Sequence, residues 1–243
     1  MKSINDTVLV PADMWQAADD TFTFTTDADV TGTDMILRIV VWYERITAPC
    51  IATYNGNVIS LLTPDPADVD IGDIAHSLSQ INRYTGHTSR PYSVAAHSII
   101  AAKHWGHIDP LAALLHDSAE AYIGDVASPL KRLLSAGYTR LASIEDRHLE
   151  AIGNALNIDS FVGRVRATKL IDKIMLVAEV RALLPYPDNP VWTPWVSGLS
   201  EEETLLVEEI VKEIQQYDKS PREVEEEFLS LYYELKENDN ADA

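Results

Sequence analysis

The residues best suited to carry out chemistry lie around His116, in the run LAALLHDSAEAYIGD. The helix expected there is apolar on both sides of His116 and Asp117, and burying an imidazole and a carboxylate is costly unless they are paired or bind a cation. Glu120 lies three residues after Asp117 and four after His116, so it projects from the same side of a helix. One helical turn is therefore predicted to present an imidazole and two carboxylates together.

Two further polar side chains stand in the same kind of apolar helical setting. His97 lies in SVAAHSIIAA, and Asp172 lies in ATKLIDKIMLVAEV. Either one alone would be interpreted as a core side chain satisfied by hydrogen bonds, but with His116 and Asp117 they favour a metal site. Imidazole and carboxylate ligands together suit zinc, manganese, cobalt or iron rather than a calcium cage.

The elements that must position these side chains are helices. Apolar periodicity predicts helices at about residues 72–83, 92–104, 109–122, 128–135, 139–157 and 160–184. Ser160 is expected to be the N-cap of the last of these. Two closing helices have clear starts, because Ser200 with Glu203 and Ser220-Pro221 with Glu223 fit capping boxes.

The chain before residue 50 has a different pattern. Thr21–Thr25 alternates with period two and Met35–Tyr43 is an apolar, β-branched and aromatic run, which together predict a β-hairpin. A second small hairpin is expected around Tyr54–Asn57. The expected fold is therefore mainly α, a helical bundle with a small N-terminal β-hairpin region. Its expected parts are a β-rich extension at 1–50, the bundle with the candidate site at 51–199, and acidic helices at 200–243 that pack on the bundle or on a partner subunit.

The composition limits the partners. The 243 residues include 38 acidic and 19 basic side chains, a net charge of -19, and 15 of the acids but only 4 of the bases lie in the last 44 residues. This balance argues against a polynucleotide groove and against docking on anionic membrane. The same balance does not exclude a small phosphorylated substrate, because a bound metal or a few local cations can make the electrostatic field positive within one cleft.

Cysteine usage and hydropathy indicate the compartment. Cys50 is the single cysteine, so the chain has no internal disulfide framework and no cysteine-built zinc site, which fits a reducing compartment. No stretch of 18 apolar residues and no long apolar leader occur in the sequence. A cytoplasmic protein is therefore expected.

The order and spacing of the candidate ligands resemble the signature of a known family. His97, His116-Asp117 and Asp172 match H…HD…D, the signature of the HD-domain metal-dependent phosphohydrolases. The stretches DIAHSLSQINRYTGHTSRPYSVAAHS and LLHDSAEAYIGDVASPLKRLL are similar to the bacterial and phage branch with the 5'-deoxynucleotidases and the phage dATP triphosphohydrolases. The resemblance covers about residues 52 to 184 and supports an HD-domain bundle, whereas the first 50 residues lie outside it.

The resemblance implies a cofactor and a set of reacting groups. The cofactor is one divalent transition metal (zinc, manganese, cobalt or iron), with room for a second divalent ion that arrives with the substrate. The implied metal ligands are His97, His116, Asp117 and Asp172. Glu120 is implied as the acid/base carboxylate for the attacking water or the leaving 5'-oxygen, and Asp117 is counted with it among the catalytic residues.

The resemblance also implies substrate contacts. Arg83 would hold the phosphate, Lys131 would supply another phosphate contact, and Asp125 would accept from the sugar hydroxyl. Tyr84 would lie beside the nucleoside, at a position where the family usually has Trp or Phe. For His87 and Arg90 two interpretations stay open, because they either reach the phosphates or belong to a solvated loop.

The expected function is a metal-dependent 5'-deoxynucleotidase that releases phosphate from 2'-deoxynucleoside 5'-monophosphates. One alternative is a dNTP triphosphohydrolase of the dATP type, which releases deoxynucleoside and triphosphate. An alternative of another class is a non-catalytic nucleotide-binding module, although a binder would not need Glu120. Guanosine tetraphosphate hydrolysis stays open, while the GYP motif of the cyclic-di-nucleotide phosphodiesterases is absent. The expected partners are a small nucleotide and, as in many enzymes of this branch, further copies of the chain, with no polynucleotide and no membrane.

Overall fold

The computed structural model describes residues 49–105, 108–135 and 141–242. They belong to one compact unit of the chain, Ile46–Ala243. The hairpin expected from Thr21–Thr25 and Met35–Tyr43 lies outside the described residues. The proposed division of the chain at residues 50 and 199 stays a prediction.

The second expected hairpin is present. Strands β1 (Cys50–Ala52) and β2 (Val58–Ser60) pair antiparallel with Ile51 opposite Ile59, and Ile59 is fully buried. Gly56 in the connecting turn has φ +90°, a conformation that side chains other than glycine adopt only with strain. The Asp73 carboxylate accepts the backbone N–H of Asn55 at 2.7 Å, which fastens the turn to the first helix.

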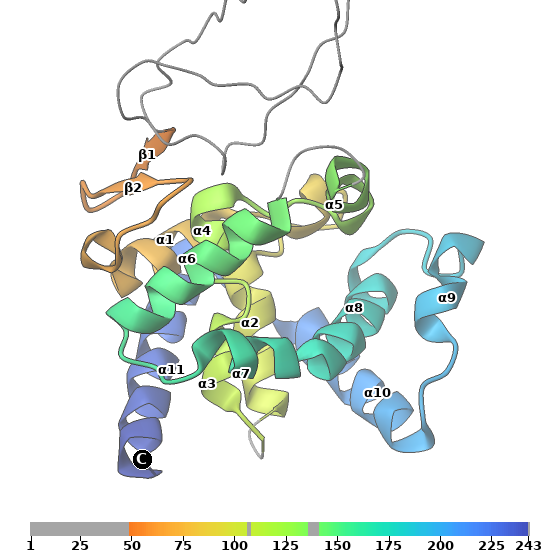
Figure 1. Ribbon diagram of the computed structural model, residues 1–243. Helices are drawn as coiled ribbons and strands as arrows, with labels where there is room; N and C mark the ends of the chain where they lie inside the picture. The colour runs from red at the N-terminus through yellow and green to blue at the C-terminus, as the bar shows by residue number, and fades with distance from the viewer. Residues whose placement is uncertain (1–48, 106–107, 136–140, 243) are drawn as a thin grey trace, which may run out of the picture. The chain divides into compact units, whose positions relative to one another are not determined.

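Helices form most of the described chain, so the expected mainly α fold is confirmed (Figure 1). In chain order they are η2 (Pro66–Asp68), α1 (Ile71–Gln80), η3 (Arg83–Gly86), α2 (Val94–His104), α3 (Pro110–Leu115), α4 (Glu120–Ile123), α5 (Ser128–Ser135), α6 (Leu141–Ala155), α7 (Phe161–Ala167), α8 (Lys169–Leu183), η4 (Pro190–Trp192), α9 (Thr193–Val196), α10 (Glu201–Gln216) and α11 (Pro221–Asp242). Within the described ranges, none of these helices has the length and apolar character needed to cross a membrane.

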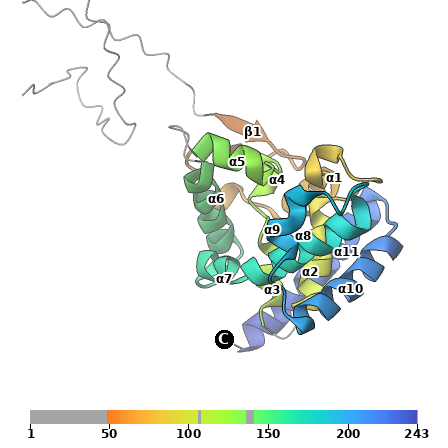
Figure 2. The same cartoon turned by 90° about the vertical axis from the view of Figure 1, so that its right-hand side faces the viewer.

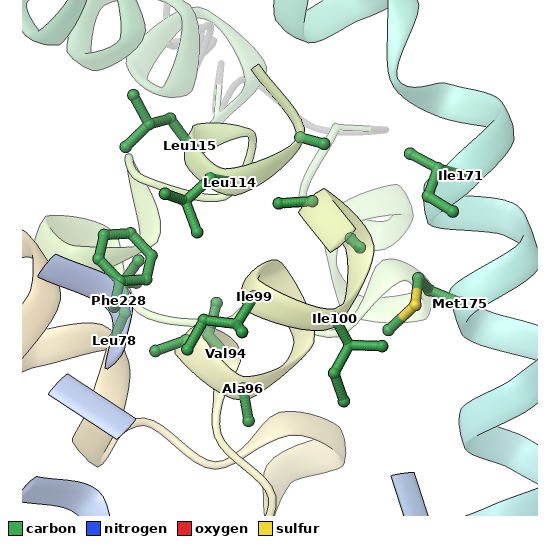
Figure 3. Close-up of a cluster of buried hydrophobic side chains, with 14 of the residues drawn as sticks. Leu78, Val94, Ala96, Ile99, Ile100, Leu114, Leu115, Ile171, Met175 and Phe228 are labelled. Atoms are coloured by element: carbon green, nitrogen blue, oxygen red, sulfur yellow. The ribbon is translucent and has the colours of Figure 1, made fainter. Parts of the chain in front are cut away.

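Helix α2 is the centre of the bundle. Every residue from Val94 to Ala102 is buried, which is expected of a helix that is apolar all round. It packs against α1, α3, α8 and α11, and Figure 1 shows it between α8 and α11, whereas Figure 2 views the bundle from the side of α8. Figure 3 shows Met175 of α8 pointing toward Ile100 of α2, with Ile171 of α8 pointing into the same cluster. Any polar side chain of α2 is therefore carried into the interior.

The expected helix at 109–122 is interrupted, which corrects the sequence prediction. Helix α3 ends at Leu115 and α4 begins at Glu120. Between them the backbone N–H groups bond the carbonyl three residues earlier, as Glu120 N–H does to Asp117 O at 2.9 Å. The His116 ring donates from Nδ1 to the Ala113 carbonyl at 2.7 Å. In a continuous helix that carbonyl would accept the backbone N–H of Asp117, so the ring of His116 competes for this acceptor at the point where the helix is interrupted.

The expected helix at 160–184 is also divided. Helices α7 and α8 meet at buried Thr168, whose hydroxyl donates to the Val165 carbonyl at 2.7 Å. Ser160 is the N-cap residue of α7, as predicted, but its side chain does not bond the first turn. Ser160 precedes α7 with φ 53° and no side-chain capping bond, because its left-handed backbone does not aim the hydroxyl at the first turn.

The two closing helices begin where the sequence predicts. The Ser200 and Glu203 capping box is formed in both directions at the start of α10, and Ser220 and Glu223 bond in the same way at the start of α11. Helix α11 packs on α1, α2 and α3, with Phe228 fully buried. The apolar side of the last helix therefore docks on the bundle of its own chain.

Candidate metal centre

Two histidines from different segments face each other in the interior. His97 of α2 is fully buried, and its Nε2 lies 3.1 Å from the Nε2 of His116. The Nδ1 of His97 is 2.5 Å from a Glu179 carboxylate oxygen, and the Nδ1 of His116 is 2.7 Å from the Ala113 carbonyl oxygen. Both partners accept hydrogen bonds, so each Nδ1 carries a hydrogen and each Nε2 presents a lone pair. Two facing lone pairs repel unless a proton or a cation lies between them.

Two carboxylates complete the cluster. Asp117 Oδ2 lies 3.2 Å from His116 Nε2 and 3.7 Å from His97 Nε2. Asp172 Oδ1 lies 3.7 Å from His97 Nε2 and 4.0 Å from His116 Nε2. His97, His116 and Asp172 each offer one ligand atom, all within 4.8 Å of one another, so this group could hold a metal ion. Three of the four ligands expected from the sequence therefore form one group, and the fourth, Asp117, lies against both of its imidazoles.

The distance between the two imidazoles fits one ion. Nitrogens bound at roughly 2.0–2.1 Å to a single metal and in adjacent positions are separated by about 3 Å, and the Nε2 atoms of His97 and His116 are 3.1 Å apart. The Asp172 side chain is 52% exposed, whereas both rings are buried. The cluster therefore meets solvent on the side of Asp172, where a substrate could approach.

The field inside the cluster is negative. Burial alone favours a neutral imidazole, but Asp117 and then Asp172 outweigh it and raise the pKa of His116 to about 9. Burial alone would likewise raise the pKa of the Asp117 carboxyl, but His116, His97 and Arg83 hold it well below its usual range. A site that attracts a proton this strongly also attracts a metal ion, which binds in the place of that proton.

Glu120 lies beside the cluster with a large pKa shift. Its side chain is almost fully buried, and burial together with the carboxylates of Asp117 and Asp125 raises its pKa to about 9. Its Oε1 is 3.4 Å from Lys131 Nζ, and its buried Oε2 has no hydrogen-bond partner among the residues that the structure describes. At neutral pH, Glu120 is therefore a protonated acid with a free oxygen, although a cation bound at Asp117 would lower its pKa.

The chain turns back toward the cluster directly after α4. Gly124 has φ +78° and ψ 160°, a region open to glycine and strained for other residues, and its N–H bonds the Glu120 carbonyl at 2.8 Å. The next residue, Asp125, is partly buried, which raises its pKa, while the charge of Arg83 opposes the increase. Asp125 therefore lies within the electrostatic reach of the cluster, while its contact with a sugar hydroxyl stays a prediction.

Lys131 of α5 is held beside Glu120. Its Nζ lies 2.8 Å from Glu145 of α6 and 3.4 Å from Glu120. Burial lowers the pKa of this ammonium group, but the two carboxylates outweigh burial and raise it. Lys131 is therefore a fixed positive charge next to the acid.

Arg83 and Tyr84 converge on a residue that the sequence did not single out. Arg83 donates from Nη1 to Asp117 at 3.3 Å and from Nε to Glu179 at 3.1 Å, and the Tyr84 hydroxyl donates to Glu179 at 2.9 Å. Glu179 is fully buried on α8. Its signal in the sequence is an acid within an apolar run, seven residues after Asp172 and hence on the same face of the helix.

Two of the expected substrate contacts lie apart from the cluster. Arg90 donates to the carbonyl oxygens of Tyr217, at 2.7 Å, and of Ile214, so it caps the end of α10. His87 is exposed after η3, and no hydrogen bond joins its ring to the cluster within the described ranges. For these two residues the structure favours the interpretation without a phosphate contact.

Comparison with known proteins places the chain in a family. No protein-family model matches the chain. It is 35% identical over 159 residues to the uncharacterized protein YfdR of Escherichia coli (strain K12), a match that covers 65% of this chain and 84% of YfdR. The chain belongs to the family of YfdR. It is also 37% identical over 107 residues to an uncharacterized protein of Rhodobacter capsulatus, covering 40% of this chain and about half (53%) of that relative. Neither YfdR nor the second relative has a described activity, so the chemistry must come from the site itself.

Proposed function

We propose that the chain is an HD-domain metal-dependent phosphohydrolase that releases phosphate from 2'-deoxynucleoside 5'-monophosphates. The observation that carries the proposal is the meeting of His97 and His116, with both lone pairs directed inward, and the carboxylates of Asp117 and Asp172. Each imidazole is held in this orientation from its other nitrogen, which is typical of metal-ligating histidines. The resemblance of the sequence to the HD enzymes supports the same reaction class.

The reacting groups have the properties that phosphate ester hydrolysis requires. A divalent ion held by these four residues would acidify a bound water and polarise a phosphoryl oxygen. Glu120 is one turn from His116, and its burial favours the protonated carboxyl, whose proton can pass to the leaving 5'-oxygen. Its oxygen without a partner leaves room for that contact.

Two cations flank the acidic cluster. Arg83 is fixed by Asp117 and Glu179, and Lys131 is fixed by Glu145. Phosphoryl transfer needs positive charge around the equatorial oxygens, and prepositioned cations supply it without reorganisation. In this proposal Arg83 and Lys131 bind the phosphate, Asp125 accepts from the sugar hydroxyl and Tyr84 lies beside the nucleoside.

The deciding experiment is a nucleotide panel with product identification. The purified protein is incubated with dAMP, AMP and dATP in the presence of manganese, cobalt or zinc, and phosphate is resolved from triphosphate. We expect phosphate from dAMP and a much slower reaction with AMP. Triphosphate from dATP would favour the triphosphohydrolase instead. Tight metal and nucleotide binding without any product would favour the binding module, and would contradict both hydrolases.

A further inference from the structure

Glu179 connects the metal ligands to the anion-binding side of the site. We propose that Glu179 is a positioning residue whose single negative charge holds both His97 and Arg83, so that metal binding and substrate binding depend on the same carboxylate. The half that concerns substrate depends on the proposed function. The half that concerns the metal depends only on the geometry of the cluster.

The two carboxylate oxygens have different partners. Oε1 of Glu179 lies 2.5 Å from Nδ1 of His97, and Oε2 accepts from Arg83 Nε at 3.1 Å and from the Tyr84 hydroxyl at 2.9 Å. These partners come from α2 and η3, while Glu179 comes from α8. One fully buried side chain of α8 therefore joins two segments that lie more than 80 residues earlier in the sequence.

The contact with His97 determines what the ring can bind. A carboxylate can only accept, so it keeps the hydrogen on Nδ1 and leaves the Nε2 lone pair for the cluster. It also makes the ring more basic, as carboxylate partners do for histidines that bind zinc. All three partners of this carboxylate can donate, and Arg83 among them is a permanent cation, so the contacts correspond to the ionised form of Glu179.

The contacts with Arg83 and Tyr84 hold a strained turn. Tyr84 and Thr85 have φ of 56° and 53°, which is uncommon for residues other than glycine and an outlier for a β-branched one. Such conformations persist where the surroundings impose them, and they gather at functional sites. The bonds to Glu179 fix both side chains that precede Thr85, so the turn presents Arg83 in one orientation.

A glutamine at position 179 could serve only one side of this network. If its carbonyl oxygen accepts from His97, its amide nitrogen faces two donors, Arg83 and Tyr84. If the amide is turned around, it donates to Nδ1 of His97 and places the hydrogen on Nε2, where it blocks the metal. Because an amide has one acceptor end and one donor end, Glu179→Gln should disturb the site in either orientation.

The test compares metal affinity in matched variants. Cobalt(II) is titrated into the full-length metal-free protein, the wild type, Glu179→Gln and Tyr84→Phe, and the absorption spectrum and Kd are recorded. We expect a Kd about 10 to 100 times higher for Glu179→Gln and an unchanged Kd for Tyr84→Phe, which loses only the hydroxyl contact. Both variants should show a higher KM for dAMP.

The alternative is that Glu179 is a buried ion-pair partner that serves stability alone. In that case Glu179→Gln lowers Tm but leaves the cobalt spectrum and Kd as in the wild type, and this result overturns the proposal. A wild-type protein that binds no cobalt also overturns it. A changed Kd without hydrolysis of any nucleotide would support the positioning of His97 and contradict the proposed reaction instead.

A second measurement does not depend on the folding of any variant. Histidine ¹⁵N chemical shifts of the zinc-loaded wild-type protein report which nitrogen of His97 carries the hydrogen. We expect the hydrogen on Nδ1, as the contact with Glu179 requires. A hydrogen on Nε2 would overturn the proposal. If Glu179→Gln does not fold, the double variant Arg83→Gln with Glu179→Gln removes both charges together, and we expect it to show the same loss of cobalt affinity.

Discussion

The candidate metal centre and the two closing helices are both rich in carboxylates, but they use them in different ways. In the centre, Glu179 is fully buried and Asp117 is largely buried, and each has several charged or polar partners. On α11, Glu226 is 62% exposed and its partner, Arg222, is 87% exposed. The number of acids in a segment therefore says little about its chemistry. What matters is whether the carboxylates are buried and whether several of them meet at one place.

The closing helices carry their charge outward because their other side is apolar. Val207, Ile210 and Ile214 of α10 and Phe228 of α11 are fully buried, while most of the acids lie on the opposite faces. Glu227 is an intermediate case, since it is partly buried and pairs with Lys103 and Lys219. The contrast between the two regions can be tested by changing one carboxylate or one core residue at a time.

The largest effect is expected for Glu120→Gln, with Glu226→Gln as the matched control. Loss of a general acid costs about 10² to 10⁴-fold in kcat, whereas the exposed Glu226 has no contact with the cluster among the described residues. Steady-state kinetics with dAMP and the metal content of each variant are measured. Equal activity of the two variants would remove the distinction between the regions, and loss of metal from Glu120→Gln would show that this residue is a ligand.

The next effect concerns how the acidic region is held on the bundle. Phe228→Ala removes a fully buried ring beneath α11, and we expect a loss of about 3–5 kcal/mol in the free energy of unfolding. Tyr233→Ala on the same helix is the control, because Tyr233 is 57% exposed. Urea denaturation followed by circular dichroism measures both. A small loss for Phe228→Ala would mean that α11 contributes little to the stability of the bundle.

A smaller effect, dependent on pH, is expected at Glu227. Burial alone would raise the pKa of this carboxyl, but hydrogen bonds from Lys103, Lys219 and Tyr217 lower it to about 2. A pKa that is lower in the folded state stabilises the protein above the pKa of the unfolded state, and this contribution is lost as the pH falls toward 2. At pH 7, Glu227→Gln should cost about 1–2 kcal/mol, reduced by solvent screening at this partly exposed site.

The measurement for Glu227 is a series of urea denaturation curves between pH 7 and pH 2.5. The difference between the wild type and Glu227→Gln should be constant down to about pH 5 and should shrink below it. A difference that stays the same across the whole series would show that the charge of Glu227 contributes nothing to stability.

The smallest effect is expected for Arg222→Ala. This side chain and its partner Glu226 are exposed to solvent, and exposed ion pairs contribute little because water and salt screen them. Thermal unfolding should give a Tm indistinguishable from that of the wild type, and added salt should not change the difference. A clear decrease of Tm at low salt would show that the surface charges of α11 act as a network.

The sequence by itself determined the fold class and most of the cluster. Apolar periodicity and capping boxes located the helices, and the hydroxyl of Ser200 is bonded as its spacing with Glu203 predicts. Polar residues in apolar helices identified His97, His116, Asp117 and Asp172, because a buried polar group needs a partner wherever it lies. These signals are local, so a single sequence contains them.

The tertiary structure alone decided which partner each group has. The break between α3 and α4 depends on the ring of His116 and a carbonyl three residues earlier, and the sequence pattern continues through it. Arg83 and Arg90 lie in one segment of the sequence, but one joins the cluster and the other caps α10. Glu179 acquires its role from segments more than 80 residues away. Contacts of this kind depend on how the helices pack, which periodicity within one helix does not determine.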